Sequence, residues 1–149
     1  GFPEEACTPE SFSTILHEAP NLALGAYYTP LPSPRDPHPE PRIVGLIVGT
    51  CAHGSRITSR AMDEHDPSGD LVCLRCVCVA PGWRGRGVAQ AMLHEYIDRV
   101  RKAKRAGAIY RSIALYTHAE LVGFYAKVGF KALGRSSVVI GLREWYDME

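Results

Sequence analysis

The sequence predicts a single α/β (α+β) domain, residues 1–149, built on a mixed central sheet with helices on both faces. Three observations support this prediction. The chain is long enough for one hydrophobic core, with 46% hydrophobic and 22% charged residues. Short runs rich in β-branched residues alternate with segments of helical periodicity. No internal repeat divides the sequence, which favours one domain.

The elements of the first half follow from capping and strand signals. A helix is expected at residues 9–17, because Thr8 can serve as its N-cap and Pro9 suits its first position. Six prolines between residues 30 and 41 exclude a helix or a central strand there, so this stretch is expected to be a surface loop. The other elements expected in this half are strands at residues 22–28, 42–51 and 71–79, a helical turn at 57–64 and a chain reversal at 66–69.

The second half contains the clearest helix. Its apolar stripe consists of Ala89, Met92, Leu93, Tyr96, Ile97 and Val100. Basic residues follow up to Arg105, where they suit the helix dipole, and Gly107 ends the helix. The remaining elements expected are a strand at residues 112–116, a helix at 118–127 that ends at Gly129, and closing strands at 130–134 and 137–146.

Charge and composition exclude several classes of function. The formal net charge of +1 and the pI near 7.8 do not favour nucleic-acid binding. No apolar run is long enough to span a bilayer, and no secretory leader is visible, so no membrane partner is expected. The five cysteines are an odd number and fit free thiols in a reducing cytoplasm better than a disulfide framework. Three of them lie at Cys73, Cys76 and Cys78, but no second ligand pair is suitably spaced, so no metal is expected.

A strand, a glycine-rich basic loop and a helix follow one another over residues 77–89. Gly85 and Gly87 let the backbone approach a ligand closely, and the helix N-terminus offers unpaired amides to an anion. Arg84 and Arg86 add charged donors. A pyrophosphate is therefore the expected guest. The sequence lacks a Walker lysine loop, and it lacks the third glycine of a dinucleotide fingerprint.

This loop resembles that of the GCN5-related N-acetyltransferase (GNAT) superfamily. The superfamily's loop has Gln or Arg, two residues, Gly, one residue, and then Gly or Ala, and Arg84 to Ala89 match it. A second resemblance lies about 40 residues later, where Tyr125 precedes the pair Gly129-Phe130. The resemblance implies acetyl-CoA as cosubstrate. The residues that it assigns to acetyl-CoA are Val77, Cys78, Val79, Arg84, Gly85, Arg86, Gly87, Val88, Ala89 and Gln90.

A narrower resemblance is to the arylalkylamine N-acetyltransferases and their fungal relatives, carried by residues 64–69, the strand up to residue 79 and residues 136–149. It implies direct acetyl transfer to a small primary amine. Tyr125 would protonate the leaving thiolate, and His118 is a candidate base. The positions that match the family's substrate lining are Tyr116, Ile140, Arg143 and Trp145.

The sequence departs from this family at two places. The family's paired histidines are replaced by Cys73 and Arg75, neither of which is a good proton acceptor. Besides His118, the candidate substitutes are Glu64, His65, Asp70 and a chain of water molecules. The family's first strand also has no counterpart. Three alternatives therefore stay open: a polyamine acetyltransferase, an inactive CoA-binding sensor or scaffold, and an enzyme that acetylates proteins.

Overall fold

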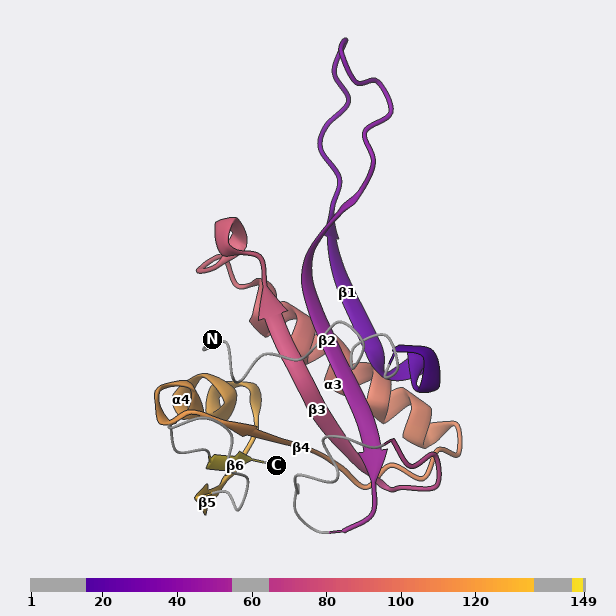
Figure 1. Ribbon diagram of the computed structural model, residues 1–149, viewed down its shortest axis with the longest axis vertical. Helices are drawn as coiled ribbons and strands as arrows, with labels where there is room; N and C mark the ends of the chain where they lie inside the picture. Colours follow the sequence, from indigo (N-terminus) through magenta and orange to yellow (C-terminus); the bar gives the residue numbers. More distant parts are fainter. Residues whose placement is uncertain (1–15, 55–64, 136–145, 149) are drawn as a thin grey trace.

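The computed structural model describes residues 16–54, 65–135 and 146–148 of the chain (Figure 1). Its strands form one sheet in the order β1-β2-β3-β4-β6-β5. The strands are β1 (Ala23–Tyr28), β2 (Arg42–Ala52), β3 (Leu71–Val79), β4 (Ser112–Thr117), β5 (Ala132–Arg135) and β6 (Tyr146–Met148). Strands β3 and β4 are parallel and every other neighbouring pair is antiparallel. The predicted mixed sheet is thus confirmed.

Strands β1 and β2 form a hairpin whose connection projects far beyond the sheet (Figure 1). Nearly all side chains between residues 29 and 41, where the proline-rich surface loop is expected, are exposed. Because proline lacks an amide hydrogen, the pairing of β1 and β2 cannot extend through this stretch.

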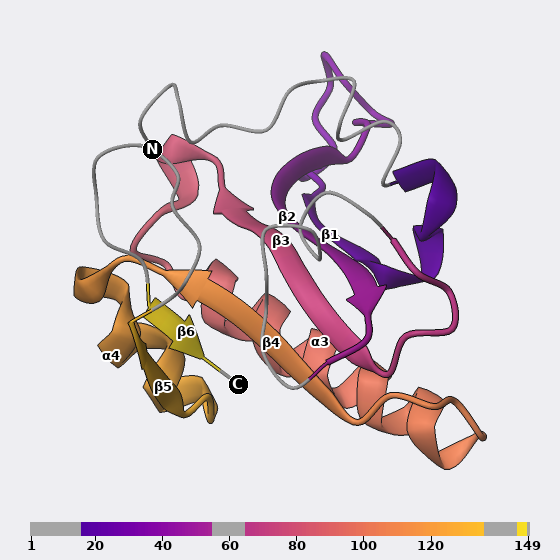
Figure 2. The same cartoon turned by 60° about the horizontal axis from the view of Figure 1, so that its bottom comes forward.

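Strands β3 and β4 pair over three residues only, Leu71–Cys73 with Ser112–Ala114. Beyond this point the two strands run apart, as Figures 1 and 2 both show. On its other edge β3 remains paired with β2, and a β-bulge at Arg75 interrupts that register between Leu74 and Cys76. A wedge therefore opens within the sheet, between residues 74–79 of β3 and the end of β4.

Two helices pack against the same side of the core. Helix α3 (Val88–Arg105) contributes Met92, Leu93 and Tyr96, and helix α4 (Ala119–Val128) contributes Tyr125 and Val128. The apolar stripe predicted for α3 is therefore its buried face. Neither described helix is long and apolar enough to cross a membrane.

The approach of α3 to the sheet depends on glycines in β2. A Cβ at Gly49 would collide with the hydroxyl of Tyr96, which donates a 2.9 Å hydrogen bond to the carbonyl oxygen of Leu22. Leu22 closes a short 3₁₀ turn, η2 (Pro20–Leu22), that precedes β1. This buried bond fixes both the helix and the entry to the sheet.

Several predicted boundaries need correction. The first closing strand covers Ala132–Arg135 rather than residues 130–134. Strand β6 occupies Tyr146–Met148, and residues 137–145 of the other expected strand lie outside the described residues. Phe130 belongs to the end of α4, because its amide donates to the carbonyl oxygen of Tyr125 while Gly129 adopts a φ of 115°. Residues 16–18 are helical, but most of the helix expected at 9–17 and the turn expected at 57–64 lie outside the described residues.

Candidate active site

The loop between β3 and α3 has the geometry of an anion cradle. Gly85 and Gly87 adopt positive φ angles of 74° and 80°, and a Cβ at either position would meet no atom within 4 Å. The loop thus faces open space, and its shape favours residues without a side chain. Gly87 is also the N-cap of α3, where no side chain makes a capping hydrogen bond. The first amides of α3 have no intrahelical partner and can bind an anion, which the helix dipole also favours.

Aromatic and basic side chains hold this loop in place. The Nε atom of Arg84 donates a 3.2 Å hydrogen bond to the carbonyl oxygen of Val79. The guanidinium of Arg86 lies 4.9 Å from the centre of the Trp83 ring, within the range of a cation–π interaction. The ring of Tyr28, at the end of β1, lies 4.7 Å from that of Trp83. Trp83 therefore connects the cradle to the β1–β2 hairpin.

A pocket of about 290 Å³ opens beside the cradle and reaches α4. Seven of the ten residues expected to bind the cofactor line it, and Trp83 and Phe124 complete the lining. The seven are Val79, Arg84, Gly85, Gly87, Val88, Ala89 and Gln90. We call this space the cradle pocket.

Three expected cofactor residues do not line the cradle pocket. Val77 packs against the core, Cys78 is exposed on β3, and Arg86 stacks on Trp83. The sequence analysis did not single out Trp83 or Phe124. Each nevertheless carried a signal, because Trp83 lies inside the glycine-rich motif and Phe124 directly precedes Tyr125.

Tyr125 lies on α4 next to the wedge between β3 and β4. Its side chain is only 8% exposed, and its ring makes edge-to-face contacts with Phe124 and Phe130, at centroid distances of 5.1 and 5.9 Å. Burial, followed by the influence of Cys76 on β3, raises the pKa of Tyr125 to about 12. The phenol therefore keeps its proton at neutral pH and is available as a donor.

His118 and Tyr116 lie where β4 leads into α4. His118 is 9% exposed and is the N-cap residue of α4, yet its side chain makes no capping hydrogen bond. Tyr116 is partly buried against the small cluster of Ala52, Leu71, Cys73 and Ala114. Residues alternate between the faces of a strand, so this cluster lies on the face opposite α3. The other expected substrate residues, Ile140, Arg143 and Trp145, lie outside the described residues.

Two candidate bases lie at the wrong end of β3. His65 and Asp70 precede the strand, whereas the cradle follows it, and nine strand residues span roughly 30 Å. Both are also engaged there: Nδ1 of His65 accepts a 3.0 Å hydrogen bond from the Cys51 amide, and Asp70 lies 3.4 Å from Arg111. Neither side chain therefore lies at the cradle. Glu64 lies outside the described residues.

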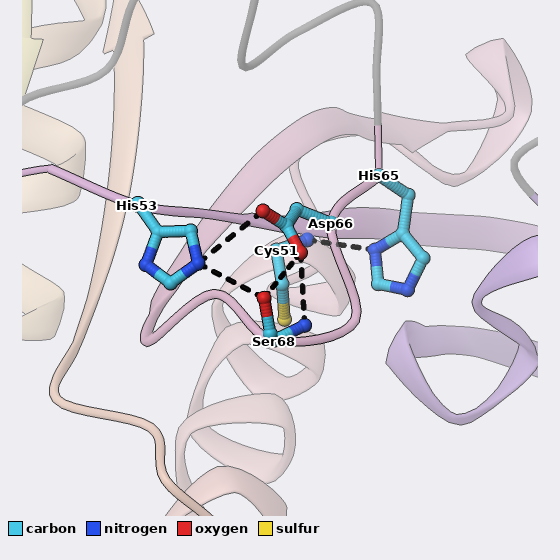
Figure 3. Close-up of polar contacts among 5 residues, drawn as sticks. All are labelled: Cys51, His53, His65, Asp66 and Ser68. Carbon is cyan, nitrogen blue, oxygen red and sulfur yellow. Dashed lines mark hydrogen bonds and ion pairs between the residues drawn. The ribbon is translucent and has the colours of Figure 1, made fainter.

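His53, Asp66 and Ser68, close to this end of β3, have the composition of a hydrolase triad (Figure 3). In a working triad the imidazole bridges the other two residues through its two nitrogens. Here Nε2 of His53 meets both Oγ of Ser68, at 3.0 Å, and Oδ2 of Asp66, at 3.3 Å. Ser68 also donates its amide and its hydroxyl to Asp66, which lowers the pKa of that carboxyl. The group therefore stabilises the turn predicted at residues 66–69.

The four cysteines that the structure describes do not assemble into a metal site. Cys51, Cys73, Cys76 and Cys78 are free thiols, of which the first two are buried. In the part of the chain that the structure describes, no three His, Cys, Asp or Glu side chains are grouped closely enough to hold a metal ion.

Comparison with known proteins relates this geometry to a family. The model of the acetyltransferase (GNAT) domain matches residues 41–132. Serotonin N-acetyltransferase from Mesocricetus auratus is 27% identical over 110 residues, which is 74% of this chain and 51% of that protein. The chain thus spans about half the length of this curated relative.

Solved structures share the fold at low sequence identity. The NatC complex bound to Gag peptide and CoA has a TM-score of 0.68 and 16% identity, covering 96% of this chain and 79% of that one. Arabidopsis thaliana Naa50 in complex with the bisubstrate analogue CoA-Ac-MVNAL has a TM-score of 0.59 and 17% identity, covering 99% and 82%. The family match includes the wedge, the cradle and Tyr125, and on this basis the chain belongs to the acetyltransferase (GNAT) domain family.

Proposed function

We propose that this chain binds acetyl-CoA at the cradle pocket and transfers the acetyl group to a primary amine. The observation that carries the proposal is the position of the cradle at the open end of a wedge within the sheet. The cradle offers free amides and nearby arginines to a pyrophosphate. The wedge leaves backbone groups of residues 74–79 facing away from β2, where they can pair with the amide-bearing arm of the cofactor.

Backbone amides of β3 near Val77, Cys78 and Val79 would hold the pantetheine arm and the acetyl carbonyl, as the family resemblance implies. Such donors stabilise the oxyanion that develops when an amine attacks a thioester. Tyr125 would then donate its proton to the departing sulfur. Its raised pKa favours the protonated phenol before the reaction, and its neighbour Phe124 lines the cradle pocket.

The amine must lose a proton before it attacks, because alkylammonium groups have pKa values of about 10. Two routes are compatible with the described residues. His118 can accept the proton at the start of α4, about 10 Å along the helix axis from Tyr125. A chain of water molecules through the wedge can do the same, since Cys73 and Arg75 replace the family's histidines.

For the acceptor we propose an arylalkylamine. The serotonin N-acetyltransferase relative supports this class, and the aromatic ring of Tyr116 is suited to stack on an aryl group. A second candidate is the terminal amine of a peptide, which is favoured by the fold likeness to structures bound to a peptide or a peptide-like analogue. Polyamine acetylation and an inactive CoA sensor are the remaining alternatives.

A direct test measures CoA release from acetyl-CoA with a thiol reagent. The acceptor panel consists of tryptamine, serotonin, phenethylamine, spermidine, putrescine and a short peptide. Saturable turnover with the aryl amines supports the proposal, and a preference for the peptide moves the assignment to the second candidate. Tight acetyl-CoA binding without turnover on any acceptor contradicts the proposed activity.

The cradle assignment predicts a sharp contrast between two glycines of the loop. Gly87→Asp should reduce the affinity for CoA at least about a hundredfold, because a carboxylate and a strained backbone would meet the pyrophosphate. Gly82→Ala is the matched control, since Gly82 also has open space around it but does not have a positive φ. Isothermal titration with CoA compares the two variants. Equal affinities for both would show that the anion binds elsewhere.

A further inference from the structure

A second pocket of about 290 Å³ lies at the opposite end of α3. It is formed by the C-terminal half of α3, the start of β4 and the end of α4, and we call it the α3–β4 pocket. Apolar side chains that include Ile97, Val100, Ile113 and Phe130 form much of its lining. None of its lining residues belongs to the cradle pocket. Because α3 has 18 residues, its two ends are roughly 25 Å apart.

Cations border this pocket, and none of its described lining residues carries a carboxylate. Its three basic residues are Arg101, Lys104 and Arg111. Arg111 is already engaged, because its Nε lies 3.4 Å from Oδ2 of Asp70 and its Nη2 donates a 2.6 Å hydrogen bond to the Gly54 carbonyl oxygen. The other two cations of the pocket are Arg101 and Lys104.

Arg101 and Lys104 differ from two other basic residues of α3. Arg99 and Lys102, which do not line the pocket, are paired with Glu95 at 3.0 Å and Asp98 at 3.1 Å. Among the described residues, no carboxylate lies within ion-pair distance of Arg101 or Lys104. Among the described residues Arg105, the last residue of α3, has no such partner either, but it does not line the pocket. Arg101 and Lys104 are therefore the two cations of α3 that border the apolar cavity without an ion pair. A carboxylate would match the two cations.

We propose that the α3–β4 pocket binds a small carboxylate with an apolar body. The apolar body lies against Ile97, Val100 and Phe130, and the carboxylate lies between Arg101 and Lys104. The volume is at the lower limit of small-molecule sites, so it suits a single ring with a short acidic chain. Because the two pockets share no residue, this ligand and CoA bind at the same time.

The test uses 3-phenylpropionate as the probe and 3-phenylpropionamide as its neutral counterpart of the same shape. Ligand titrations followed by NMR at low salt should give saturable binding of the carboxylate, about tenfold tighter than that of the amide. Saturating CoA should leave this affinity unchanged. Binding sites are then assigned with variants that remove charge without removing length.

Lys104→Gln and Arg101→Gln should each weaken binding of the carboxylate about fivefold or more. Lys102→Gln is the matched control, because Lys102 lies on the same helix but is paired and outside the pocket. It should leave the affinity unchanged. Circular dichroism and CoA affinity verify that each variant is folded.

Four outcomes overturn the proposal. They are equal affinity for the amide and the carboxylate, displacement of the probe by CoA, equal losses for Lys102→Gln and Lys104→Gln, and no saturation at millimolar concentration. The first two place the probe in another site. The third reduces the effect to the general charge of the helix, and the fourth shows that the pocket does not bind this class of ligand. Each result is independent of whether the chain transfers acetyl groups.

Discussion

Two buried tyrosines show how the same residue type serves different purposes in this chain. The hydroxyl of Tyr96 is bound to a carbonyl oxygen within the core, whereas Tyr125 lies beside the wedge in the sheet. Burial is the largest cause of the raised pKa in both side chains. The difference between the structural role of Tyr96 and the proposed catalytic role of Tyr125 therefore comes from the residues around each side chain, and not from the phenol itself.

Tyr125→Phe should reduce kcat about a hundredfold while leaving acetyl-CoA affinity within about twofold, because only the proton donor is lost. Steady-state kinetics and CoA titrations measure the two effects. The pKa of about 12 also predicts that activity does not fall through ionisation of Tyr125 below about pH 10.

Tyr96→Phe is the control for this experiment. It leaves the Leu22 carbonyl without its hydrogen bond and should lower the free energy of unfolding by about 1–3 kcal/mol. It should not change kcat. Full activity of Tyr125→Phe would remove that residue from the mechanism, and a loss of stability alone would assign it to the core.

At the residue scale, the sequence was sufficient to identify candidate site residues but not the contacts that these residues make in space. Arg84, Gly85 and Gly87 could be found because a short motif places all of them on one loop. The contacts of Trp83 with Tyr28 and Arg86 could not, because Tyr28 lies more than fifty residues earlier in the chain. A single sequence carries no signal for such a distant contact.

At the scale of elements, the packing of α3 on β2 depends on what each glycine of the strand faces. A Cβ at Gly45 would come within 2.8 Å of the end of the flexible Met92 side chain. A Cβ at Gly49 would instead meet the hydroxyl of Tyr96, which is fixed by its bond to Leu22. Methionine can adjust to such a contact, but the bound tyrosine cannot move without losing its hydrogen bond.

Gly49→Ala should therefore lower the free energy of unfolding by about 2 kcal/mol or more, and Gly45→Ala by less than about 1 kcal/mol. Urea denaturation of the two variants measures the difference. If Gly45→Ala proves as destabilising as Gly49→Ala, the limit on helix packing is general crowding rather than the fixed hydroxyl of Tyr96.

Periodicity identified α3 and α4, and β-branched runs identified the strands up to β4. The bulge at Arg75 was not predictable, because it arises from pairing with β2 and leaves no mark in the local sequence. Phe130 looked like the start of a strand for a similar reason: its apolar side chain fits both a strand and the contact that closes a helix.

At the scale of the whole molecule, two buried thiols make the free energy of unfolding depend on pH in the alkaline range. Burial raises the pKa of Cys51 to about 11 and that of Cys73 to about 12, from an ordinary value of 9.0. At pH values between the ordinary thiol pKa and these raised values, the unfolded chain loses thiol protons that the folded chain keeps. The free energy of unfolding therefore falls as pH rises.

Each thiol should contribute a loss on the order of 1–2 kcal/mol between pH 8 and about 10.5. Urea titrations across this range measure the slope. Cys73→Ala should make the slope shallower, whereas Cys78→Ala should not, because Cys78 is exposed. A slope that neither variant changes would assign the effect to other groups.

The fold class and the order of the elements were predictable because they depend on local patterns and chain connectivity. The separation of β3 from β4 was not, because it depends on a register that ends after three residue pairs. The cradle could therefore be predicted from the sequence, whereas the wedge beside it could be found only in the three-dimensional structure.

The short pairing of β3 with β4 also bears on how the protein could select one nucleotide ligand over others. A phosphate cradle binds ATP, NAD and CoA through the same group and cannot by itself tell them apart. In the described part of the chain, no strand pairs with the β4-facing edge of β3 beyond Cys73. A guest whose tail carries peptide-like amides can extend the ladder there, and a guest that ends in a ribose or a nicotinamide ring cannot. Discrimination would then rest with the tail of the ligand, and the sheet itself would act as the selective surface.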